Sequence, residues 1–520
     1  MVLDIKPIHN DGLNCIEDVI VSLAAYYNRE YILAFAEAFR FEYVRPDIEQ
    51  EVLIGSYINS GMKNMLYLIN QYCGISIEII EPKSVQKVIQ VINEQLQVGL
   101  PTGIYIKSYW CPWHLEYQKL SHAHFCLAIG FDDGGNIICI DPSLGLDTYS
   151  LPYNDFVNGF GTCCTFSIGQ PPKAISYELV LKNAVEVIPN TNIFTNMRRF
   201  IADFYTSMNF HEEYKNADIC LFDVPMHRNL WYKSGERKLF SEFIKYIYKM
   251  TLNAGLLDVS DDLLYVRSKW SVADALLIKA HYAGYSEKVK ENVCNVFKEI
   301  LEIEENIYEK LNDIVHGNYI TTLRKDCNND YARDISKGYV FIDLKEYYNN
   351  IAFHSSCSLE CSADFTGTGA YLLSHNAPSG QVISSNDMIF RFPVLSDGSP
   401  DNISCNGQKI CLPVNTYKGI MFLGTAEWGS FIENVGIEST NGDRINIKIN
   451  FSDWVVEKPL YDEKFIWTGM NYEKKQASSL PQKNCSIMAI YRTIENIKDL
   501  DSIILPCCPN IHIFAITLCK

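Results

Sequence analysis

Residues 11–17 read Asp11-Gly12-Leu13-Asn14-Cys15-Ile16-Glu17, a turn that opens onto apolar residues spaced three and four apart. Asn14 followed three residues later by Glu17 approximates a capping box, which predicts that a helix begins here with Cys15 in its first turn. The unpaired amide groups and the positive end of a helix favour a thiolate over a thiol. The stretch therefore makes Cys15 a candidate nucleophile.

A second informative stretch contains an apolar run from His124 to Phe131, the turn sequence Asp132-Asp133-Gly134-Gly135-Asn136, and another apolar run that ends at Asp141. This pattern predicts a β-hairpin with His124 opening one strand and Asp141 closing the next. A cysteine on a helix with a histidine and an aspartate on strands is typical of papain-like thiol enzymes. In that interpretation His124 is the base for Cys15, and Asp141 orients the imidazole.

These residues also have structural explanations. The chain contains 18 cysteines, and a cysteine is usually a small buried hydrophobe. His122 and His124 could be histidines that only satisfy structural hydrogen bonds. Between them, His124 is the favoured base because it borders the apolar run. The order Cys, His, Asp, with the cysteine at a capped helix start, favours catalysis.

Length and composition indicate a globular protein of two or three domains, because 520 residues exceed one ordinary core. Hydrophobic residues make up 48% of the chain and charged residues 21%, which argues against disorder. The net charge of -17 gives nucleic-acid binding little electrostatic support.

The chain shows no export or membrane signal. Residues 1–6 lack the basic segment and apolar core of a signal peptide. The apolar stretch 503–519 is interrupted by Pro506, Pro509 and His512, which favours a terminal strand over a membrane span. We therefore expect a cytoplasmic protein with reduced thiols and no membrane contact. The richness in Ile, Asn, Lys and Tyr indicates a low-GC bacterial genome.

Cysteine pairs at 163–164, 507–508 and 357/361 raise the question of zinc. No pair has a second Cys/His doublet at finger or ribbon spacing, and the chain lacks both a Walker A loop and a His-Glu-x-x-His motif. We expect no metal and no resident cofactor.

Three regions follow from hydrophobic periodicity. Residues 1–170 place helices before strands, an α+β order. Residues 171–345 have apolar residues at helical spacing, with Gly255 expected to end one helix, Ser271 to begin the next, and a long acidic helix over 287–315. The charges of that helix are explained by solvent exposure, with partner docking as the alternative. Residues 346–520 form short strand candidates separated by turns, as in a β-sandwich.

The N-terminal half resembles the family named for the N-terminal domain of the butirosin biosynthesis H protein. This family is a branch of the papain fold related to bacteriocin-processing cysteine peptidases. The resemblance rests on the helix start Asn14-Cys15-Ile16-Glu17, the strand start His124-Phe125 and the strand end Asp141-Pro142, and it extends more loosely into the helical region.

This resemblance implies a papain-like catalytic domain with the triad Cys15, His124 and Asp141. It also implies an amide-forming acyltransferase of antibiotic biosynthesis, for which the enzyme that forms the amides of closthioamide is a related precedent. An acyl or peptidyl carrier protein would deliver the acyl group as a phosphopantetheine thioester, and a small amine would accept it. The resemblance says nothing about the oligomeric state.

The last region is similar to a jelly-roll of the galactose-binding kind. The similarity is carried by Phe392-Pro393, Asp401-Asn402, Gly407-Gln408 and Ser452-Asp453-Trp454. In a fusion of this type, the sandwich is more often architecture, a lid or a partner surface than a sugar-binding domain.

The residues before the nucleophile depart from the papain pattern, which commonly has a glutamine there as an oxyanion donor. This chain has His9 and Asn10. Asn10, together with the backbone N–H of Cys15, is a candidate oxyanion donor, and His9 is the alternative. Both residues could also do no more than shape the turn.

Two further groups are candidates for substrate contacts. Trp110 and Trp113 lie in an aromatic loop before the hairpin and could form a wall of a dry acyl channel, with core packing as the alternative. Lys233, Arg237 and Lys238 form a candidate basic patch for an acidic carrier protein, with a solvated charged face as the alternative.

Two other functions compete with acyl transfer. A cytoplasmic cysteine peptidase or amidase would use the same triad with water as acceptor, and a binding protein could retain the fold with a retired active site. The residues beyond the first domain favour transfer, because a simple processing peptidase would not need them.

Overall fold

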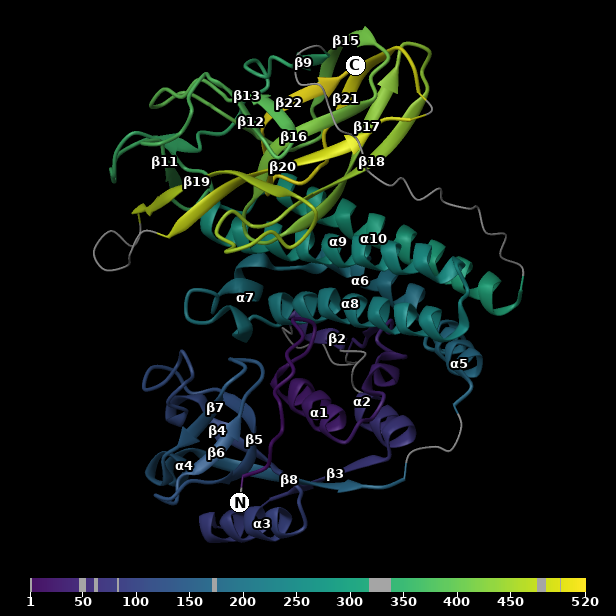
Figure 1. Cartoon of the computed structure of the whole chain (residues 1–520), viewed down its shortest axis with the longest axis vertical. Coiled ribbons are helices and arrows are strands. Elements are labelled where there is room, and N and C mark those ends of the chain that lie inside the picture. The colour runs from purple at the N-terminus through teal and green to yellow at the C-terminus, as the bar shows by residue number, and fades with distance from the viewer. Residues whose placement is uncertain are drawn as a thin grey trace.

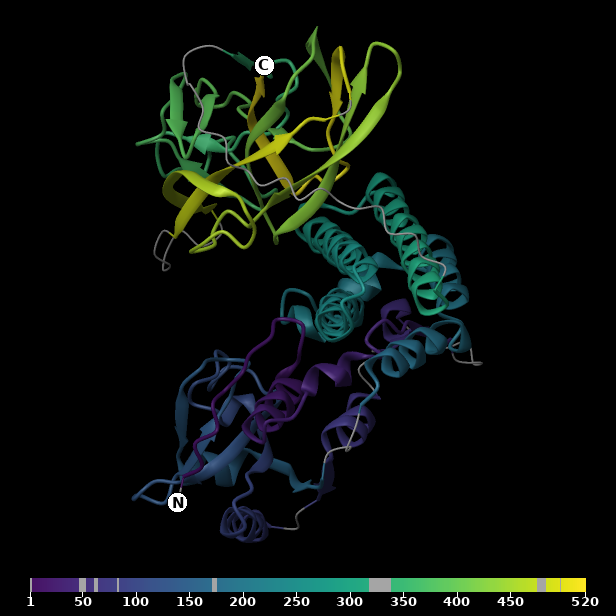
Figure 2. The ribbon, with the colours of Figure 1, turned by 45° about the vertical axis from the view of Figure 1, so that its right-hand side comes forward.

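The computed structural model describes residues 2–45, 53–59, 64–81, 84–170, 175–317, 338–474, 483–495 and 497–520. An N-terminal region of helices and strands lies at one end of the long axis, a layer of long helices in the middle, and a β-sandwich at the other end (Figures 1 and 2). The predicted mixed α+β architecture with a helical middle region and a C-terminal β-sandwich is confirmed.

The N-terminal region is built on an antiparallel sheet of six strands in the order β3-β8-β4-β5-β6-β7. In chain order the strands are β3 Ile75–Ile80, β4 Thr102–Lys107, β5 Ala123–Phe131, β6 Ile137–Ile140, β7 Thr148–Leu151 and β8 Phe160–Ile168. The helices are α1 Cys15–Tyr26, α2 Met65–Leu68, α3 Val85–Gln97 and α4 Tyr153–Gly159, and a short pair joins β1 Glu42–Tyr43 to β2 Ile58–Asn59. Helix α1 packs against β5, which places the predicted helix start beside the predicted hairpin.

The middle layer consists of α5 Tyr177–Asn190, α6 Ile193–Ser207, α7 Phe210–Tyr214, α8 Pro225–Thr251, α9 Gly255–Ala283 and α10 Glu287–Val315. Helix α10 has the predicted bounds. The predictions that one helix ends at Gly255 and that the next begins at Ser271 are both wrong. Leu252, in the left-handed conformation, ends α8, whereas Gly255 begins α9 and Ser271 lies inside it. The apolar faces continue across both positions, because α9 is buried between α8 and α10.

Lys233 and Arg237 do not form a surface patch, because both side chains are fully buried in α8. Arg237 donates from Nε and Nη2 to the two carboxylate oxygens of Glu304 on α10, at 2.7 and 2.8 Å, and Lys233 lies 2.7 Å from Glu236. Buried charges are retained when they are paired in this way. Two of the three residues of the candidate carrier-binding patch therefore belong to an internal ion-pair network, while the third, Lys238, is partly exposed and pairs with Asp11.

The C-terminal region contains two main sheets. One has eight strands in the order β10-β11-β19-β20-β16-β22-β14, with β9 also paired to β22, and the other has four in the order β15-β21-β17-β18. Their bounds are β9 Tyr339–Phe341, β10 Phe353–His354, β11 Ala370–Leu373, β14 Ile403–Ser404, β15 Lys409–Asn415, β16 Gly419–Ala426, β17 Phe431–Ser439, β18 Arg444–Phe451, β19 Lys464–Glu473, β20 Asn484–Thr493, β21 Leu500–Ile504 and β22 Ile511–Cys519. A separate hairpin joins β12 Val382–Ser385 to β13 Met388–Arg391.

The two predicted region boundaries lie at residues 170/171 and 345/346. Residues 171–174, at the first boundary, lie outside the described residues. At the second boundary, β9 already pairs with β22, so the sandwich includes residues that the prediction places in the helical region. Among the described residues, no helix has both the length and the apolar character needed to cross a membrane.

The segment that precedes α1 meets α8 at two glycines. A Cβ atom on Gly235 would lie 2.8 Å from the carbonyl oxygen of Gly12, and one on Gly12 would lie 2.9 Å from the carbonyl oxygen of Gly235. Two backbones can approach this closely only without side chains. Gly235 thus brings the middle layer directly against the turn that precedes Cys15.

We expect Gly235→Ala to destabilise the protein by about 1–3 kcal/mol, because backbone atoms on both sides must move to admit the methyl group. Thermal unfolding measures the loss as a lower Tm. Gly161→Ala is the matched control, since its new Cβ would meet nothing closer than 3.5 Å. Equal Tm values for the two variants would contradict the close approach.

Candidate active site

Helix α1 begins as the sequence predicts. Asn14 is the N-cap, and its side-chain oxygen accepts hydrogen bonds from the backbone N–H groups of Ile16 and Glu17, both at 3.0 Å. The Glu17 carboxylate in turn accepts from the N–H of Asn14 at 3.0 Å, which completes the capping box. Cys15 is therefore the first helical residue. Its backbone N–H has no partner within the described part of the chain.

His124 and Asp141 lie together because of the hairpin register. Leu127 on β5 pairs with Ile140 on β6, so one further step places Asp141 opposite Cys126, two residues from His124 on the same face. The Nε2 atom of His124 lies 2.6 Å from Oδ2 of Asp141. Both side chains are buried, and the structure brings these two predicted residues together.

Cys15 interacts electrostatically with the His124 imidazole, whose Nε2 faces Asp141. Burial alone would lower the pKa of His124, but the hydrogen bond to Asp141 and the interaction with Cys15 raise it to about 10. Burial alone would raise the pKa of Asp141, but the hydrogen bond from His124 holds it below its usual value. The electrostatics favour an imidazolium at His124 beside an ionised Asp141 carboxylate.

Two additional side chains position the Asp141 carboxylate. The indole Nε1 of Trp113 donates to Oδ2 at 2.8 Å, and the hydroxyl of Ser143 donates to Oδ1 at 2.8 Å. The Trp113 ring also stacks on Tyr149, with centroids 4.8 Å apart. Trp113, predicted as a wall for substrate, thus has an orienting contact with the triad. Trp110 packs beside Gly159. A Cβ atom added at Gly159 would lie 2.5 Å from the Cβ atom of Trp110.

Cys15 lies between the sheet and the middle layer. Burial raises the pKa of Tyr105 on β4 and of Tyr232 on α8, and the charge of Cys15 contributes to both shifts. Cys15 is therefore close to side chains from both regions. Tyr232 could not be predicted from the sequence, because nothing in its spacing links α8 to Cys15.

The two candidate oxyanion residues have different environments. The Asn10 amide donates to Glu242 at 2.9 Å, and its oxygen accepts from Lys238 at 2.9 Å, so its side chain is engaged with α8. The Nδ1 atom of His9 lies 2.7 Å from Oδ2 of Asp18, while 43% of the His9 side chain is exposed. Asp18 is buried one turn after Cys15, and this burial raises its pKa to about 6. The second ring nitrogen of His9 remains as a potential donor.

His122 is not part of the triad. Its Nδ1 lies 2.9 Å from the Glu116 carboxylate, and its Nε2 lies 3.3 Å from Asp223. Glu116, His122 and Cys220 place donor atoms within 4.8 Å of one another, so of the described residues these could hold a metal ion. The cysteine pairs considered above do not contribute to this group.

Comparison with known proteins identifies one region. Residues 341–520 match the family model of the AziU2-like beta-sandwich domain. No curated protein matches the chain. The match begins before the predicted start at residue 346 and covers the C-terminal sandwich alone, so it does not extend to the Cys15 site.

The AziU2-like domain is attached to α9 by buried polar contacts. The Lys269 ammonium lies 2.6 Å from Glu433 on β17, and Ser268 accepts from the N–H of Ile432 at 2.7 Å. The Lys279 ammonium lies 2.5 Å from Glu427, after β16. These contacts hold the sandwich on the face of the middle layer opposite the Cys15 site (Figure 1).

Proposed function

We propose that the chain is a thiol acyltransferase. It would move an acyl group from a carrier-protein thioester through Cys15 to an amine and form an amide, within bacterial natural-product biosynthesis. The observation that carries this proposal is the buried pair of His124 and Asp141, 2.6 Å apart, with Cys15 near enough to contribute to the raised pKa of the imidazole. A papain-like fold for the first region and a jelly-roll for the last are part of the same proposal.

The first half-reaction transfers the acyl group to the enzyme. The Cys15 thiolate attacks the thioester carbonyl, the new C–S bond forms, and the C–S bond to phosphopantetheine breaks. The departing pantetheine thiolate takes the proton from the His124 imidazolium, and Asp141 keeps the ring oriented.

In the second half-reaction an amine attacks the acyl-enzyme. Neutral His124 accepts the amine proton, the C–N bond forms, and the C–S bond to Cys15 breaks to restore the thiolate–imidazolium pair. No ATP or metal is consumed, because the incoming thioester already carries the activation and aminolysis of a thioester runs downhill.

Transfer rather than hydrolysis requires a site that excludes water. The support is the position of Cys15 between Tyr105 of the sheet and Tyr232 of α8, with the close contact of Gly12 and Gly235 beside it. A peptidase or amidase shares the first half-reaction, and a binding protein with a retired site would have no need of the assembled triad.

Intact-protein mass spectrometry distinguishes these functions. The protein is mixed with a panel of acyl-pantetheine thioesters and then divided between buffer and buffer with a simple amine. Amide-forming transfer predicts an acyl adduct that amine discharges much faster than water, with the amide recovered in solution. Equal discharge in the two buffers identifies a hydrolase, and the absence of an adduct with any thioester contradicts the proposal.

We expect His9→Ala to slow acylation by about 10²-fold, as loss of one oxyanion donor does in acyl transfer, and Asn10→Ala to have a much smaller effect. The reason is that His9 binds Asp18 through Nδ1 and its Nε2 has no hydrogen bond to the described residues, while the Asn10 amide is bound to Glu242. Single-turnover acylation rates measure the difference. If Asn10→Ala proves the more damaging variant, the oxyanion assignment reverses.

A further inference from the structure

A pocket of about 400 Å³ lies where the C-terminal end of α9 meets the AziU2-like domain. Residues that line it include Tyr282, Thr366, Trp428, Asp453, Trp454 and Glu473. Pockets that bind small molecules commonly lie between domains and combine aromatic surface with a few polar groups. The middle layer separates this pocket from α1, so the proposed acyl transfer does not use it (Figure 1).

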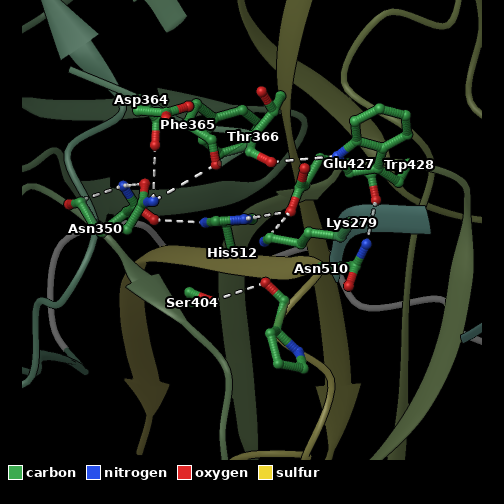
Figure 3. Close-up of polar contacts among 12 residues, drawn as sticks. Lys279, Asn350, Asp364, Phe365, Thr366, Ser404, Glu427, Trp428, Asn510 and His512 are labelled. Atoms are coloured by element: carbon green, nitrogen blue, oxygen red, sulfur yellow. Dashed lines mark hydrogen bonds and ion pairs between the residues drawn. The ribbon is translucent and has the colours of Figure 1, made fainter. Parts of the chain in front are cut away.

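Contacts between α9 and the residues after β16 hold the pocket walls in place. Lys279 and Tyr282 are three residues apart on α9, and Glu427 and Trp428 are adjacent after β16. The Lys279 ammonium lies 2.5 Å from the Glu427 carboxylate, and the rings of Tyr282 and Trp428 are stacked, with centroids 5.9 Å apart and an angle of 11°. The Trp428 indole also donates to the carbonyl of Thr366 at 3.2 Å (Figure 3). The aromatic wall is therefore preorganised.

The charges on the wall have one sign. Asp453 accepts hydrogen bonds from the backbone N–H groups of Gly429 and Val455, at 2.7 and 3.1 Å, with no cationic partner in the described part of the chain. The Glu473 carboxylate likewise has no hydrogen bond or ion pair among the described residues. None of the described residues lining the pocket is a lysine, arginine or histidine. Lys279 is already neutralised by Glu427.

The hydroxyl groups of the wall offer little to a neutral polar ligand. Thr366 and Thr368 hydrogen-bond to each other, with their oxygens 2.9 Å apart. Ionised carboxylates supply only hydrogen-bond acceptors, so they suit a ligand that brings donors or positive charge. Aromatic faces next to uncompensated carboxylates match an organic cation.

We propose that this pocket binds a small organic ammonium ion, held by the aromatic side chains of Tyr282, Trp428 and Trp454 and by the carboxylates of Asp453 and Glu473. This binding site is independent of the thioester chemistry. It gives the AziU2-like domain a ligand-binding role in addition to its structural one.

Isothermal titration of the full-length protein tests the proposal, with choline as the probe and, as the comparison, the uncharged alcohol in which carbon replaces the choline nitrogen. We expect saturable choline binding, and about tenfold weaker affinity in Glu473→Gln, in the range of losing a partly desolvated cation contact. Glu457→Gln removes an exposed carboxylate of the same domain outside the pocket wall and should bind as the wild type does.

Three results would overturn the proposal: no saturable binding of choline, equal affinity for choline and its uncharged analogue, or equal affinity of Glu473→Gln and the wild type. Near-UV circular dichroism establishes that both variants retain native packing. Cys15→Ala should bind choline normally, so failure of the acyltransferase proposal and failure of the pocket proposal are distinguishable.

Discussion

Cys15→Ala is expected to form no acyl adduct with any thioester that acylates the wild type, a loss of about four orders of magnitude or more in the acylation rate. The reason is chemical, because the variant lacks the sulfur atom that carries the acyl group. His124, Asp141 and the Asn14 cap remain, since the Cys15 side chain has no part in the capping box. The free energy of unfolding of the variant should therefore stay within about 1 kcal/mol of the wild-type value. Its Tm should change little.

Other cysteines provide the controls. Cys220 is half-buried like Cys15 but lies outside the triad, and burial raises the pKa of the Cys111 thiol well above its usual value. Cys220→Ala and Cys111→Ala should acylate at the wild-type rate, as measured by intact mass against time. An adduct that persists in Cys15→Ala and disappears in Cys220→Ala would move the nucleophile to another residue.

Asp141→Asn is expected to slow acylation by about a hundredfold or more and to change its pH dependence. The Asp141 carboxylate and Cys15 together raise the pKa of His124 to about 10 against the opposing effect of burial. In the wild type the protonated imidazole is thus present at neutral pH and is lost as the pH rises through about 10. Without the carboxylate, that loss moves to lower pH, so the alkaline limb of the rate profile moves toward neutrality.

Single-turnover acylation rates measured across the neutral and alkaline range give both effects. Asp147→Asn is the matched control, because Asp147 is an exposed carboxylate in the loop after Asp141. It should leave the rate and the profile unchanged. A slow Asp141→Asn variant with an unshifted alkaline limb would mean that Asp141 only packs against His124 and does not set its charge.

Local sequence signals predicted the elements that carry the triad. The cap at Asn14 depends on side chains within three residues, and the hairpin depends on a turn and two apolar runs, so both could be read without knowledge of the rest of the chain. The helix over 287–315 could be predicted equally well, because its apolar stripe is uninterrupted. In β17, by contrast, Glu433 stands at a buried position of the alternation, and only the long-range pair with Lys269 explains that residue.

The remaining features depend on partners that are distant in sequence. In the sequence alone, Lys233 and Arg237 resemble a surface patch. In the structure, Glu304 on α10 binds Arg237, and carbonyl oxygens of the chain before Phe41 accept hydrogen bonds from both side chains. The Asn10 amide is occupied by Glu242, and Trp113 is directed to Asp141 by the packing of Tyr149. Spacing along the chain carries no information about such pairings, because they form only when separate elements pack together.

The attachment of the sandwich to α9 bears on any attempt to divide the polypeptide for separate production. Cutting at residue 338, where helices give way to strands, would leave Lys269 without Glu433 and expose the apolar surface on which β17 rests. A fragment made in this way would be prone to self-association, whatever the state of the Cys15 site.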